Sequence, residues 1–147
     1  MLLWVTLAFA ARVSEKQMQR WLVELVPAVE AAAGRRFVER PELVLDDRAR
    51  VEKLLLDNAV RFERFAPGSM PTAPTIDPGI IALYSLNTQR VYVVTESVLS
   101  IFERVVDDTA LLEPFVRCAI AHELTHALQH QHGLMALDAG ATRRWKP

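Results

Sequence analysis

The sequence predicts an α+β domain, on three observations. Apolar residues recur at helical spacing in residues 14–33 and again in residues 48–65. Residues 80–95 contain two β-rich runs separated by a few polar residues, which is the pattern of a hairpin. A further helical segment lies near the end of the chain, and all four histidines of the sequence fall in it or just after it.

Length and composition indicate a single globular domain. With 147 residues the chain can bury one hydrophobic core but not two of ordinary size. Hydrophobic residues make up 51% of the chain and charged residues 24%, which argues against disorder, and a net charge of -1 suggests no nucleic-acid partner. The single cysteine, Cys118, excludes an intrachain disulfide, and its apolar neighbours predict a small buried side chain.

Residues 1–13 are expected to be either a weak signal segment or the start of the core. They begin with an apolar run that includes Ala-Phe-Ala, the small-residue spacing of a signal-peptidase site. No Lys or Arg precedes this run, however, and it is much shorter than the roughly 20 residues that span a bilayer. Localisation, exported or cytoplasmic, therefore stays open, and membrane association has no support beyond this segment.

The first helix is expected from Ser14 to Ala33. Ser14 followed by Gln17 has the spacing of a capping box, and Gly34 is placed to end the helix. Pro27 lies inside it and is expected to kink or split it, because proline lacks the N–H that a helix interior needs.

A strand, a second helix and the hairpin are expected to follow. Residues 41–47 are short and branched enough for a strand, and residues 48–65 continue as the second helix. Residues 66–79 carry four of the eight prolines and two of the five glycines, which predicts a surface loop. In the hairpin at residues 80–95, Asn87 suits the turn.

The last helix is predicted to be enclosed by protein. A helix over residues 96–106 should precede it, and Pro114 suits its first turn. From Phe115 to Leu128 apolar residues fall on nearly every side of the helical wheel. The polar groups inside that run therefore need specific roles.

Within the last helix the residues from His122 to His126 form an HExxH motif. Histidines four apart differ by about 40° around a helix and by ~6 Å along it, so both can reach one metal ion. Zinc, bound ~2.0–2.1 Å from each nitrogen, suits this geometry. Glu123 borders the same space and can accept a proton as a general base. The alternative is a pair of core histidines satisfied by carbonyls or carboxylates.

Two histidines do not complete a catalytic zinc site, which normally has three protein ligands. His132 occupies the position of the third histidine in the metzincin pattern HExxHxxGxxH, but Gln129 replaces the glycine that ends the helix there. On a continuous helix His132 lies about 240° around from His126 and faces away. His130 lies ~12 Å along the axis from His122 and is expected to face solvent. Asp138 would reach the site only if the tail folded back.

The stretch AIAHELTHALQHQH, with the hairpin LYSLNTQRVYVV before it, resembles the gluzincin branch of the zincin metallopeptidases, especially bacterial ones. The likeness covers roughly residues 34–133. It implies a zincin-like subdomain over residues 14–133, in which a small mixed sheet with an edge hairpin packs on helices that include a buried HExxH helix. It further implies zinc bound by His122 and His126, Glu123 as general base, and a peptide or protein substrate paired with an edge strand at residues 80–86.

The sequence departs from this family in one respect. Gluzincins take their third zinc ligand, a glutamate, from a helix downstream of HExxH, and no glutamate follows Glu123 in this chain. Residues 134–147 are therefore expected to be an irregular tail or a truncation point, with the C-terminal half of the peptidase absent. The hypothesis is a zinc-dependent peptidase that is incomplete in this chain. The alternatives are a non-catalytic zinc-binding or interaction module with the same fold, and a helical packing domain.

Overall fold

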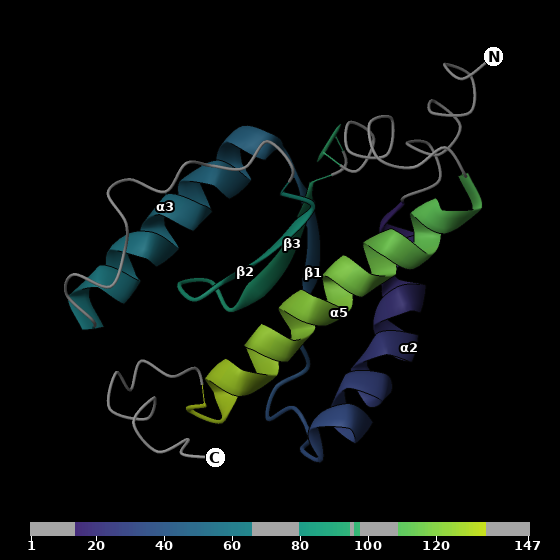
Figure 1. Cartoon of the computed structure of the whole chain (residues 1–147), viewed down its shortest axis with the longest axis horizontal. Coiled ribbons are helices and arrows are strands. Elements are labelled where there is room, and N and C mark those ends of the chain that lie inside the picture. The colour runs from purple at the N-terminus through teal and green to yellow at the C-terminus, as the bar shows by residue number, and fades with distance from the viewer. Residues whose placement is uncertain (1–13, 66–79, 95, 98–108, 135–147) are drawn as a thin grey trace, which may run out of the picture.

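The computed structural model describes residues 14–65, 80–94, 96–97 and 109–134. Within these residues the chain is mixed α/β, with three α-helices and one three-stranded mixed sheet (Figure 1). No helix among them is long and apolar enough to cross a membrane. Four expectations lie outside the described residues: the segment 1–13, the loop 66–79, most of the helix over 96–106, and the tail beyond residue 134.

The first helix, α2, spans Glu15–Ala33 as predicted. The Ser14 hydroxyl accepts a hydrogen bond from the Gln17 N–H at 3.2 Å, and Gly34 ends the helix with a left-handed φ of 65°. The helix continues through Pro27, so the predicted split does not occur. Pro27 lies on the exposed side of the helix. Water can therefore hydrogen-bond to the carbonyl that loses its helical N–H donor. The buried side chains on the opposite side keep the helix packed against the core.

The sheet has β3, Arg90–Val94, as its central strand. β1, Leu43–Asp46, pairs with it in parallel, and β2, Ala82–Ser85, pairs with it antiparallel, so the predicted strand and hairpin are both confirmed. The strand order β1-β3-β2 leaves β2 at one edge of the described sheet.

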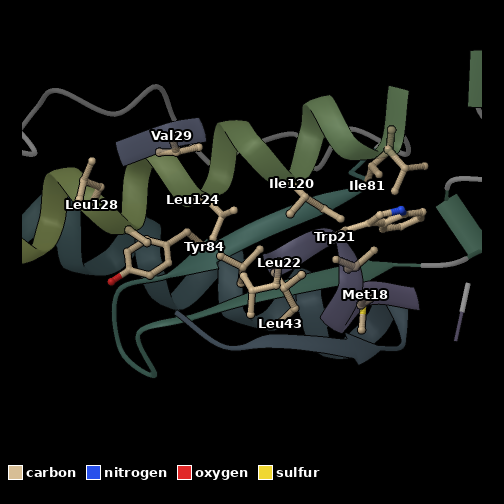
Figure 2. Packing of buried hydrophobic residues seen from close by; sticks show 14 of the residues in the cluster. Met18, Trp21, Leu22, Val29, Leu43, Ile81, Tyr84, Ile120, Leu124 and Leu128 are labelled. Atoms are coloured by element: carbon tan, nitrogen blue, oxygen red, sulfur yellow. The ribbon is translucent and has the colours of Figure 1, made fainter. Parts of the chain in front are cut away.

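The sheet is covered on both faces (Figure 1). α2 and the last helix, α5 (Leu112–Gln131), pack on one face, where they meet Val91 and Val93 of β3. α3, Arg48–Phe65, packs on the other face against Tyr92 and Val94. Alternate residues of the central strand therefore pack into two different cores. This explains why four successive residues of β3 are buried, from Val91 to Val94. Figure 2 shows the larger core, in which α2 and α5 side chains meet those of the strands.

Only one side of α5 is buried, which corrects the prediction of an enclosed helix. Its buried side chains are those of Leu112, Val116, Ile120, Leu124, Ala127 and Leu128. Phe115 is 39% exposed and Cys118 is also exposed, so the expectation of a buried cysteine is wrong. The helix begins two residues before Pro114, after a short 3-10 turn, η1, at Thr109–Leu111. Pro114 is tolerated there because N–H groups in the first turn have no helical acceptor.

Candidate functional site

The HExxH motif is anchored to the core by its middle residue. Leu124 is completely buried between α5, α2 and the sheet (Figure 2). His122, about half a turn earlier and so on the other side of the helix, is exposed, and Glu123 and His126 are half-buried. The helical phase set by the buried leucine therefore turns both histidines toward accessible space.

The imidazoles of His122 and His126 converge on one point. Their Nε2 atoms lie 3.0 Å apart, and the rings meet edge to face with centroids 4.6 Å apart. Two nitrogens bound to a tetrahedral zinc would be roughly 3.3–3.4 Å apart, given Zn–N distances of ~2.0–2.1 Å. A small side-chain rotation is enough to bring the pair to that spacing. The donor set and its geometry therefore fit zinc.

Glu123 completes the group on the sheet side. One ligand atom from each of His122, Glu123 and His126 lies within 4.8 Å of the others. The Glu123 Oε2 accepts a hydrogen bond from the backbone N–H of Tyr84, on the edge strand β2, at 2.6 Å. This bond fixes the carboxylate beside the two imidazoles.

Burial raises the pKa of the Glu123 carboxyl above its usual range. The Tyr84 N–H and the nearby imidazoles oppose this shift, because both favour the ionised form, but burial is the larger effect. A carboxylate with a raised pKa is a stronger proton acceptor than an ordinary surface glutamate.

Gln129 supports His126, a role the sequence interpretation missed. Its Oε1 lies 3.3 Å from the Nδ1 of His126. If Nδ1 carries the proton, its N–H donates a hydrogen bond to this oxygen, and the Nε2 is left with its lone pair directed at the shared point. The signal was available in the sequence, since residues three apart on a helix are neighbours.

The two remaining histidines have partners outside this group. The Nδ1 of His130 lies 2.8 Å from the Tyr84 hydroxyl, and the ring is half-buried, so the expectation that His130 faces solvent is wrong. The Nε2 of His132 lies 2.8 Å from the carbonyl oxygen of Arg36. Gln131, between them, also bonds the segment after α2, through Val38 and Glu39. These residues connect the end of α5 to the loop after α2.

A groove of about 390 Å³ opens beside the motif. One wall is the start of β2 with the residues before it, and the other is the first half of α5. The residues that line it are Ile80, Ile81, Ala82, Phe115, Cys118, Ala119, His122 and Glu123. The groove is mainly apolar, and it ends at the polar group that could hold a metal.

Among the described residues, the group of His122, Glu123 and His126 is the single candidate for a metal site. Asp138, considered above as a distant ligand, lies outside the described residues. Comparisons of the chain with family models, curated proteins and solved structures found no match. The chemistry assigned to the site therefore depends on the motif and its geometry.

Proposed function

We propose that this chain is a zinc-binding, peptidase-type domain. His122 and His126 would hold the ion and Glu123 would act as general base. The observation that carries the proposal is the convergence of both Nε2 atoms beside a half-buried carboxylate at the end of an apolar groove. Zinc, when bound, supplies Lewis-acid chemistry that activates water and polarises a carbonyl.

The protein's own contribution is to hold and move a proton. Glu123 accepts the proton of the attacking water and delivers it to the nitrogen of the leaving amine, so the carboxylate is regenerated at the end of the cycle. The Tyr84 N–H holds Oε2 in place during both transfers. Its other oxygen, Oε1, has no hydrogen-bond partner among the described residues and is the atom suited to the transfer.

The edge strand β2 and the groove are suited to an extended peptide. A peptide can add to a sheet edge through main-chain hydrogen bonds while its side chains occupy adjacent pockets. β2 lies at such an edge, and its first residues form a wall of the groove that leads to Glu123. This placement would bring a peptide carbonyl next to the base.

A non-catalytic zinc module is the second candidate. It is favoured by the composition of the metal group, which holds two histidines and one carboxylate among the described residues. If Glu123 served as the third ligand, it would not be free to act as a base. The two candidates share the metal and differ in the role of this one residue.

Zinc titration and peptide hydrolysis, measured on the same variants, separate these possibilities. The wild-type chain should bind one zinc, and His126→Ala should weaken binding at least about tenfold. His132→Ala is the matched control, because its imidazole contacts the Arg36 carbonyl and not the metal group. Glu123→Gln should retain zinc while hydrolysis of a mixed peptide library falls by about 10²-fold or more.

Three outcomes would decide against parts of this proposal. Equal zinc affinity in wild type and His126→Ala would remove the metal site. Zinc binding that fails in Glu123→Gln would make Glu123 a ligand and favour the non-catalytic module. Undiminished hydrolysis in Glu123→Gln would remove it as the base.

A further inference from the structure

The outward-facing main-chain groups of β2 belong to alternate residues. The Val94 N–H donates to the Ile81 carbonyl at 2.8 Å, and Ala82 and Tyr84 stand opposite Val93 and Val91. In an antiparallel pair this pattern directs the N–H and C=O of Ala82 and of Tyr84 away from β3. These groups form the edge on which a peptide could add.

Asn58 of α3 covers part of that edge. Its Nδ2 donates to the Tyr84 carbonyl at 2.8 Å, and its Oδ1 accepts from the Leu86 N–H at 3.0 Å. One residue of a parallel strand would bond its neighbour in the same way, through the C=O of one residue and the N–H two residues later. Asn58 is 5% exposed, so its amide is buried where it makes these two hydrogen bonds. With the Tyr84 N–H bonded to Glu123, this part of the edge is occupied.

The main-chain groups of Ala82 differ from those of Tyr84. The outward N–H and C=O of Ala82 have no hydrogen-bond partner among the described residues, and the residue lines the groove. From Phe115 to Glu123 the groove follows α5 for roughly 12 Å, at ~1.5 Å per residue. An extended peptide rises ~3.4 Å per residue, so three to four residues would fill it.

We propose that Asn58 limits peptide recognition to one side of Glu123. An extended segment of about three apolar residues pairs with Ala82 in the groove, and Asn58 prevents the pairing from continuing along Tyr84 and Leu86. Peptide residues that extend past Glu123 then add little to the affinity of the peptide. Asn58 is therefore a residue that determines specificity for peptide length. This inference rests on the proposed binding of peptides, but it requires neither zinc nor hydrolysis.

Cys118 provides a direct assay of groove occupancy. It is exposed on the groove wall and is the chain's single cysteine, so alkylation by iodoacetamide, followed by mass spectrometry, reports on one site. With acetyl-Ala-Phe-Ala-amide as the probe and a dissociation constant of about 1 mM, about 5 mM peptide should slow alkylation about sixfold. Absence of protection at that concentration would overturn the proposal.

Ala82→Pro tests the main-chain pairing. Proline removes the outward N–H and leaves the bonds to β3 intact, which an edge strand tolerates. Protection by the tripeptide should fall below about twofold, whereas Ala82→Val, which keeps the N–H, should retain it. Equal protection in the two variants would contradict pairing at Ala82. Circular dichroism confirms that both variants fold.

The role of Asn58 is tested by peptide length. Extending the tripeptide by three alanines at either end should tighten binding to the wild-type chain less than about twofold. In Asn58→Ala the affinity for one of the extended peptides should rise about tenfold, through two new main-chain hydrogen bonds, while the affinity for the tripeptide is unchanged. Asn87→Ala, in the exposed turn, is the matched control. A tenfold gain in the wild type, or no gain in a folded Asn58→Ala, would overturn the proposal. If that variant fails to fold, the wild-type length series still decides.

Discussion

Replacing Gln129 with leucine should weaken zinc binding without disturbing the fold. The Gln129 Oε1 lies 3.3 Å from the His126 Nδ1, and the side chain is half-buried on the surface of α5. Leucine has a similar size but cannot accept the Nδ1–H. The imidazole then loses the partner that favours the tautomer with a free Nε2.

The expected magnitude follows from the length of this hydrogen bond. Loss of a group that orients a metal ligand costs about 10–100-fold in affinity. At 3.3 Å the bond is longer than the ~2.9–3.0 Å optimum, so the lower end applies. A tenfold loss is about 1.4 kcal/mol. At saturating zinc the same amount is lost from the zinc-dependent stabilisation, which for a domain of this size is roughly 3–6 °C in Tm.

Isothermal titration with zinc and thermal melts with and without zinc measure the two quantities. Gln129→Glu is the matched variant, because a carboxylate keeps the acceptor and should bind zinc at least as tightly as wild type. Without zinc all three proteins should melt within about 2 °C of one another, since the Gln129 side chain is only half-buried. Equal zinc affinity in Gln129→Leu and wild type would refute the assigned role. So would an equal loss in both variants.

Three further predictions concern the metal-free chain. Burial raises the pKa of Glu123, so the folded wild-type chain loses stability as the carboxyl ionises with rising pH. A glutamine side chain cannot ionise, so Glu123→Gln should have a higher Tm than wild type at pH 8. The difference in Tm should shrink toward pH 4. A difference in thermal melts that grows as pH falls would contradict this. Leu124→Ala should lower the free energy of unfolding by about 3 kcal/mol in urea titrations, because the side chain is fully buried; a change below about 1 kcal/mol would argue against its anchoring role. Gln131→Ala should cost about 1–2 kcal/mol in the same assay, since it loses hydrogen bonds to Val38 and Glu39, and faster amide exchange at these two residues is expected. Unchanged exchange there would argue against the connection.

The elements that the sequence predicted well depend on neighbours in the chain. The cap at Ser14, the left-handed Gly34 and the spacing of the two motif histidines all act within one or two helical turns. The hairpin is likewise local, since its strands are joined by a short turn. Local signals of this kind were enough to predict the helix and strand order of the described residues and to bring His122 and His126 together.

The errors came from judging a helix by its own composition. α5 is apolar on nearly every side, yet only one side meets α2 and the sheet, which leaves Cys118 exposed. His130 was assigned to solvent because its position on the helix excluded the metal, but the Tyr84 hydroxyl lies beside it. Neither outcome can be inferred from helical periodicity, because each depends on which other elements pack against α5.

The features that shape the site chemically are contacts between distant segments. Tyr84 and Glu123 are 39 residues apart, and Asn58 reaches Tyr84 and Leu86 from another helix across the sheet edge. The sequence alone supplied the metal-binding pattern, because a helix fixes the spacing of its own side chains. The raised pKa of Glu123, and the part of the β2 edge that is left for a peptide, could be inferred only from the packing of α3, β2 and α5. The reason is that burial and hydrogen bonding depend on what surrounds a group in space.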